Sequence, residues 1–164
     1  MKASSMGEYI PALFNFDKNE KIVYLAATDN YSGFMVFAFE SGRVAKVDMK
    51  SYFTKTNRKK LIKAYFEDEP LVECEYLQKD EDIVLKSSSG KIVIFNTSEL
   101  SLKQTKNTQG IIVMKQKKGC KLTEAKVYVQ GSIEQEEIYK VKKIPSTGKL
   151  PQNLKSICEQ MTLE

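Results

Sequence analysis

The chain has 164 residues, of which 41% are hydrophobic and 29% charged, and its formal net charge is +5; this fits one globular domain and excludes a disordered chain. It has no histidine and three widely spaced cysteines, which excludes a Cys/His zinc site, so we interpret the cysteines as free thiols in a reducing compartment. No apolar run reaches transmembrane length and the first residues lack the core of a signal peptide, so we expect a cytosolic protein.

The first half of the chain is predicted to hold a lead-in segment (1–20) and three strands. Apolar, β-prone residues predict strands at 22–28, 34–39 and 43–49, and we expect the first of them to be central in a sheet. Turn residues separate the strands at 29–33 and at Ser41-Gly42. Residues 57–65 predict a loop with one helical turn. Residues 67–82 carry eight acids and one lysine, which we interpret as a solvated linker.

The pattern of residues 34–52 then recurs at 83–100. Gly42 and Gly90 are 48 residues apart, and at this offset Val44 aligns with Ile92 and Val47 with Phe95. Each copy continues into a basic, polar stretch. A period near 50 with about four strand-like segments per unit is typical of a bladed or otherwise repeated β architecture.

The second half continues with further strands and a tail. Strands are predicted at 111–114 and 121–129, and residues 138–144 are ambiguous between strand and helix. Leu154, Ile157, Cys158 and Met161 follow helical spacing after Pro151, which predicts a short terminal helix. We therefore expect two repeat units, at about 21–80 and 81–130, and a tail at 131–164 with a partial unit and this helix.

Positive charge clusters in the loops after each predicted hairpin. Between Glu40 and Lys63 there are eight Lys or Arg and two acids, and from Lys86 to Lys121 there are eight Lys and one acid. Such a cationic edge favours a polyanionic partner, and Asn57, Thr105 and Thr108 add neutral hydrogen-bonding groups. The alternative is that lysines on strand edges only discourage aggregation, which we prefer for Lys86 and Lys142. The candidate binding residues are Arg43, Lys46, Lys55, Arg58, Lys59, Lys60, Lys63, Lys91, Lys103, Lys106, Lys115, Lys117, Lys118 and Lys121.

The chain resembles the C-terminal domain of the A subunit of bacterial type IIA topoisomerases, the family of DNA gyrase and topoisomerase IV. The resemblance is carried by the hairpins around Gly42 and Gly90, the Ser-Glu-Leu ending at Leu100, and the strand that follows Gly110. It covers roughly residues 8–130. It implies an all-β fold, a β-pinwheel of propeller-like, four-stranded blades, here a partial array of two to three blades.

The resemblance also implies a function. Duplex DNA would bend around a basic rim without sequence-specific contacts, and the catalytic core and the B subunit of an ATP-dependent topoisomerase would be partners in the bacterial cytoplasm and nucleoid. The acids at 67–82 would repel DNA from the opposite side. The chain lacks the Gln-Arg-Arg-Gly-Gly box of gyrase, because its nearest stretch is Lys115-Gln-Lys-Lys-Gly119. A shortened, topoisomerase-IV-like form therefore fits better than full DNA wrapping.

No catalytic constellation is visible in the sequence. Enzymes of this family cut DNA with a tyrosine that follows an arginine, and none of the eight tyrosines here does. There is no P-loop and no histidine base, and we expect no cofactor and no metal. We therefore expect that the chain is not an enzyme by itself. Two alternatives to duplex binding stay open, namely a protein-interaction module and a β module that binds single strands or RNA through exposed aromatic residues.

Overall fold

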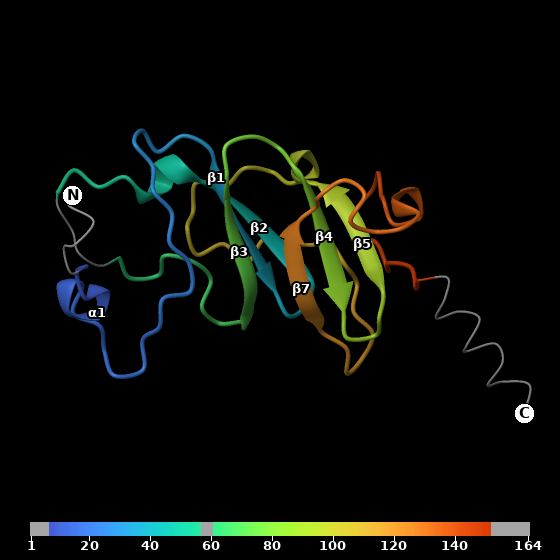
Figure 1. Cartoon of the computed structure of the whole chain (residues 1–164), viewed down its shortest axis with the longest axis horizontal. Helices are drawn as coiled ribbons and strands as arrows, with labels where there is room; N and C mark the ends of the chain where they lie inside the picture. Colours follow the sequence, from blue (N-terminus) through green and yellow to red (C-terminus); the bar gives the residue numbers. More distant parts are fainter. Residues whose placement is uncertain (1–6, 57–60, 152–164) are drawn as a thin grey trace, which may run out of the picture.

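The computed structural model describes residues 7–56 and 61–151, and seven strands in two antiparallel sheets dominate them (Figure 1). We call the first sheet, of strand order β3-β1-β2-β6, module 1, and the second, of order β5-β4-β7, module 2. Short helical turns complete the fold. Module 1 contains β1 (Phe34–Phe39), β2 (Arg43–Asp48), β3 (Leu71–Leu77) and β6 (Ile111–Ile112); module 2 contains β4 (Asp82–Ser87), β5 (Ile92–Asn96) and β7 (Leu122–Val127); the helical turns are α1 (Ile10–Leu13), η1 (Met49–Tyr52), η2 (Thr97–Glu99) and η3 (Glu136–Ile138).

The two modules repeat the same hairpin at an offset of 48 residues. Met35 pairs with Val47 in module 1, and Ile83 pairs with Phe95 in module 2. Each first strand also pairs with a third strand, and in both modules that ladder shifts register just before the first strand ends. In both modules the last residue of the second strand caps the following 3₁₀ turn with its side chain. The repeat predicted from the sequence is therefore present in the backbone.

The modules stack front to back around a shared core. One face of β1, with Phe34, Val36 and Ala38, packs against Ile83 and Leu85 of β4. The other face of module 1, which we call the front face, is equivalent by the repeat to the side of module 2 that packs on module 1. The front face consists of Met35, Phe37, Phe39, Ala45, Val47 and Cys74.

No further sheet covers the front face within the described residues. Side chains of the β2–β3 loop cover it instead: Tyr65 stacks on Phe37 with ring centroids 5.8 Å apart, and Phe66 meets Phe39 edge-on at 5.8 Å. On the far side of module 2, Tyr139 and neighbouring residues of the tail pack in the same way. Each end of the stack is thus closed by a loop.

Two sequence predictions are wrong, and the others agree with the structure. Residues 22–28 do not form a central strand; they are extended, and Val23 and Leu25 are 62% and 77% exposed. The predicted linker contains β3, because apolar residues such as Leu71, Cys74 and Leu77 alternate with its acids and outweigh them. The strands predicted near 34–39, 43–49, 111–114 and 121–129 are found. In the ambiguous stretch 138–144, η3 ends at Ile138 and no strand follows. The predicted terminal helix beyond Pro151 lies outside the described residues.

The turn of the first hairpin requires glycine. Gly42 has φ of +83°, its N–H donates to the carbonyl of Phe39 at 2.9 Å, and Gly90 repeats this arrangement in module 2 with φ of +75°. A Cβ on Gly42 would collide with the carbonyl oxygen of Met114. We expect Gly42→Ala to destabilise the fold by roughly 2 kcal/mol, since left-handed strain and the collision add together.

Gly119→Ala is the matched control for that substitution. Gly119 has φ of +79° but no atom within 4 Å of its ideal Cβ, so only the conformational part of the cost remains. Urea unfolding of both variants separates the two contributions. Equal losses would show that the approach of Met114 to Gly42 does not constrain the turn.

Candidate nucleic-acid interface

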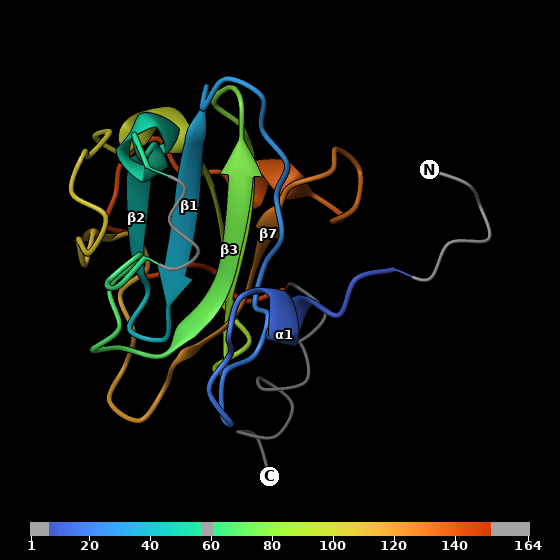
Figure 2. The same cartoon turned by 90° about the vertical axis from the view of Figure 1, so that its left-hand side faces the viewer.

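The chain segment around β6 runs along the outer edge of β2. At one end Lys103 donates its N–H to Lys46 O at 2.8 Å and accepts the N–H of Asp48 at 2.8 Å. At the other end Val113 donates to Gly42 O at 2.9 Å. Figure 2 shows this segment, in yellow, on the far side of β2 from β1 and β3. Residues 103–113 therefore border module 1 along the whole of β2.

Residues 139–149 form the equivalent border of module 2. Lys149 and Ile92 of β5 exchange backbone hydrogen bonds of 2.8 and 3.0 Å, and residues 139–141 bond to the same strand. The two borders meet directly, because Lys115 donates its N–H to Ser146 O at 2.8 Å. We call residues 103–118 and 139–149 together the outer border. It forms one continuous surface along both modules.

The outer border carries positive charge without negative charge. Residues 101–120 contain five lysines and no acid, and residues 139–151 contain four lysines and no acid. The exposed lysines of the outer border are Lys103, Lys115, Lys117, Lys118, Lys142, Lys143 and Lys149. A row of ammonium groups with no carboxylates between them attracts polyanions.

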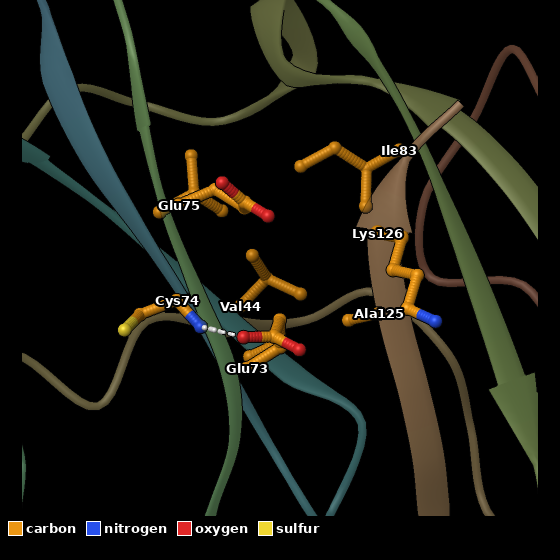
Figure 3. A pocket seen from close by; sticks show the side chains of 9 residues that line it. Val44, Glu73, Cys74, Glu75, Ile83, Ala125 and Lys126 are labelled. Atoms are coloured by element: carbon orange, nitrogen blue, oxygen red, sulfur yellow. Dashed lines mark hydrogen bonds between the residues drawn. The ribbon is translucent and has the colours of Figure 1, made fainter. Parts of the chain in front are cut away.

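The opposite edge of the sheets is acidic. Strand β3 lies at that edge of module 1, next to β7 of module 2, and Figure 3 shows Glu73 and Glu75 of β3 between these strands. Burial raises the pKa of Glu75, and the neighbouring charge of Glu73 adds to this effect. Positive and negative charge are therefore separated across the width of each sheet, as the sequence predicted.

Several predicted binding residues lie on the outer border. Lys103, Lys115, Lys117 and Lys118 are exposed there. Lys106 is half-buried, and its Nζ donates to Ser51 O at 3.4 Å, which brings the loop after β2 to the same border. Of the neutral candidates on this segment, Thr105 is exposed and Thr108 accepts the N–H of Gly110.

Other predicted residues lie beside the border or engage protein groups. Arg43 is half-buried and its Nη1 donates to Gly110 O at 3.5 Å. Lys91 follows the second hairpin turn, and Lys121 forms an ion pair of 2.8 Å with Glu40. Lys55 and Lys63 are exposed in the loop after η1. Asn57, Arg58, Lys59 and Lys60 lie outside the described residues.

Lys46 is an internal residue and does not join the surface. It is 7% exposed, its Nζ lies 2.6 Å from Asp80 Oδ1 and 3.2 Å from Thr97 O, and it sits 4.2 Å from the ring centre of Phe34. The hydrogen bond from Lys46 lowers the pKa of Asp80, and a hydrogen bond from Thr97 also lowers it, against desolvation. This lysine ties β2 to the chain between β3 and β4.

The sequence did not single out Lys142, Lys143 and Lys149. Lys142 was interpreted as a solitary surface lysine, yet it lies with Lys143 on the outer border of module 2. The repeat pattern was a usable signal, because β5 is the copy of β2 and its outer edge also needs a bordering segment. The tail that supplies this segment has no sequence match to residues 103–113.

No family model matches the chain. The chain is 25% identical over 134 residues to the DNA gyrase A protein of Borrelia hermsii (strain HS1 / DAH), and this match covers 79% of the chain and 16% of that protein. The C-terminal domain of DNA topoisomerase IV has a similar structure, with a TM-score of 0.65 and 20% identity over 75% of this chain and 39% of that one. The resemblance to the type IIA topoisomerase A subunits is confirmed.

The other solved structures agree on the fold. The E. coli ParC C-terminal domain matches with a TM-score of 0.64 and 12% identity, over 92% of this chain and 68% of that one. The DNA gyrase A C-terminal domain matches with a TM-score of 0.56 and 21% identity, over 72% and 39%. The predicted all-β, pinwheel-type fold is confirmed. The chain spans about one sixth of the length of the gyrase protein that it matches.

The described residues offer binding groups and no reactive group. Burial raises the pKa of the Cys74 thiol to about 11, with further increases from Glu73 and Glu75, so this thiol is protonated at neutral pH. In residues 7–56 and 61–151 there is no cluster of three or more acids or cysteines placed to hold a metal ion. No helix in the same residues is long and apolar enough to cross a membrane.

Proposed function

We propose that this chain is a DNA-binding accessory domain from the A subunit of a type IIA topoisomerase, and that duplex DNA lies along the outer border. The lysines contact phosphates and release counterions, so binding is tight at low salt and independent of sequence. The domain holds and bends DNA for a catalytic core outside this chain. It is not an enzyme by itself, and the core, the bacterial cytoplasm and the B subunit complete this proposal.

The observation that carries the proposal is the repetition of the outer border. Two structurally equivalent edges, those of β2 and β5, each carry a lysine-rich segment without acids, and the segments are joined between Lys115 and Ser146. A lysine row that only discouraged aggregation would not have to follow one side of both modules, with the acids on the other. The blade boundaries at about residue 80 stay a prediction, since β6 from the second unit pairs with β2 of the first.

A salt series on linear and supercoiled duplex DNA tests the proposal. The logarithm of the binding constant is expected to fall linearly with the logarithm of salt concentration, with a slope of about −0.9 per phosphate contact. Preference for supercoiled over linear DNA would come from curvature or crossings rather than base sequence. Binding that stays constant between low and moderate salt would contradict phosphate contacts.

Competition experiments separate the alternatives. A single-strand or RNA binder needs exposed aromatic rings for base stacking, and of the aromatic residues near the border only Phe53 is largely exposed, at 59%. We expect duplex DNA to compete better than single-stranded DNA or RNA of equal length. Capture of a protein partner, together with no gel shift at low salt, would favour the protein-interaction module.

A further inference from the structure

The wrongly predicted strand at 22–28 corresponds to a position in the repeat. Third strands β3 and β7 each end a few residues before the next module begins, as Leu77 does before Asp82. Thr28 precedes Phe34, the first residue of β1, by a similar distance. Residues 22–28 therefore occupy the sequence position of a third strand, ahead of the first hairpin.

The structure places residues 22–28 where such a strand would lie. The segment runs extended alongside β3 (Figures 1 and 2), as β3 runs alongside β7. Tyr24 Oη accepts the N–H of Tyr76 at 3.0 Å, and the hydroxyls of Thr28 and Tyr76 are 3.5 Å apart. Among the described residues the segment makes no backbone–backbone hydrogen bond, while Ile22, Val23 and Leu25 are 50%, 62% and 77% exposed. It has the sequence of a strand and no sheet to join.

A second segment repeats this situation on the other side of the front face. In module 2 the chain leaves β5 and adds Ile111 of β6 to the edge of β2, in the preceding module. The chain that leaves β2 reaches Ile62 after a similar number of residues, and Ile62 is 85% exposed. Residues 61–63 are therefore the counterpart of β6, again without a strand to pair with.

We propose that residues 22–28 and 61–63 are the two flanking strands for a third β-hairpin of the same repeat, seated on the front face from outside these 164 residues. In module 1 the order β3-β1-β2-β6 places a hairpin between a third strand and a fourth contributed by the next loop. The same order on the front face is segment 22–28, the incoming hairpin, and segment 61–63. The hairpin packs on Met35, Phe37 and Phe39 in the way that module 1 packs on Ile83 and Leu85.

The aromatic residues of the β2–β3 loop now cover the surface that the hairpin would take. Tyr65 and Phe66 close the front face when no hairpin is present, and they are half-buried rather than part of the buried core. Tyr52 Oη donates to Ala64 O at 2.8 Å and holds this loop in place. Docking needs the loop to shift outward, toward the position that β6 takes beside β2.

A peptide with the sequence of residues 31–51 of this chain, cyclised through its ends, is the probe. Wild-type protein is expected to bind it saturably, and amide hydrogen exchange is expected to slow at 22–28 and 61–65. The variant Val23→Asp/Leu25→Asp places charges on exposed positions that the hairpin would bury, so we expect affinity to fall about tenfold or more. Gln130→Asp/Ser132→Asp, at exposed positions of the tail, is the matched control and should bind like wild type.

Each contrary result overturns this proposal and leaves DNA binding to its own test. No binding, equal binding by the aspartate variant, or slowed exchange only at β6 or in the tail would exclude a hairpin site on the front face. Self-association of the protein alone, with slowed exchange at 22–28, would assign this surface to a second copy instead. DNA affinity of the Val23→Asp/Leu25→Asp variant is measured in parallel, and loss of it would show a misfolded variant.

Discussion

Replacing Lys103, Lys115, Lys117 and Lys118 together with glutamine is expected to lower the affinity for duplex DNA at about 0.1 M salt by at least about a hundredfold. All four side chains are exposed on the outer border, so the substitutions remove charge without disturbing the core. Each lost phosphate contact removes about 0.9 from the salt slope, so three or four lost contacts flatten it by about 3. Fluorescence anisotropy with a labelled duplex at several salt concentrations measures both quantities.

The control is a second variant with the same change of charge away from the border. Lys18, Lys21, Lys79 and Lys126 are also exposed, and Lys79 and Lys126 pair only with nearby carboxylates at the surface. Such surface pairs contribute little to stability. Glutamine at these four positions is expected to change affinity severalfold at most. Equal losses in the two variants would mean that net charge alone, rather than the outer border, attracts DNA.

Asp80→Ala is expected to destabilise the protein by about 2–3 kcal/mol, whereas Lys46→Met costs about 1 kcal/mol or less. Removing Asp80 leaves the ammonium of Lys46, whose side chain is only 8% exposed, without its counter-ion. Removing the charge of Lys46 leaves Asp80 with a hydrogen bond from Thr97 and with solvent, since its side chain is 42% exposed. Methionine also keeps the apolar contact with Phe34. The asymmetry follows from which partner is buried.

Urea unfolding across pH checks the same ion pair. The pKa of Asp80 is lowered in the folded state, and an unfolded aspartate titrates near about 3.9. The contribution of Asp80 to stability is therefore full above that pH and is lost as the pH falls toward the lower folded pKa. The difference between wild type and Asp80→Asn should shrink in this acid range. A constant difference, or a larger loss in Lys46→Met, would contradict the arrangement.

Local sequence pattern was sufficient for the repeated hairpins. Strands β1 and β4 are apolar and β-prone, and glycine at 42 and 90 gives the turn its position, so the register followed from spacing. The acids of β3 concealed a strand, because they lie at a sheet edge while apolar neighbours face the core. Segment 22–28 shows the opposite case, in which β propensity is present and pairing is not. Propensity describes one strand, and a strand forms only against another.

The candidate site was predictable in part for the same reason. Clustered charge identified residues 103–118, but Lys46 lies in the same apparent run and is buried by the alternation of side chains along β2. Conversely, Lys142 and Lys143 look isolated in the sequence and reach the outer border only because the tail runs along β5. Placing them required the non-local pairing of the tail, which no local pattern encodes.

The central claim is that one border, repeated over both modules, holds the DNA, and Lys142→Gln/Lys143→Gln tests it most directly. Both lysines are exposed on the border of module 2, far in sequence from the cluster at 103–118. The matched control is Lys86→Gln/Lys126→Gln, on β4 and β7 of the same module. We predict that the border variant lowers the salt slope for duplex binding by about 1 to 2 and weakens binding about tenfold or more, while the control keeps the wild-type slope. A wild-type slope in the border variant, or an equal loss in both, would contradict a DNA path shared by the two modules.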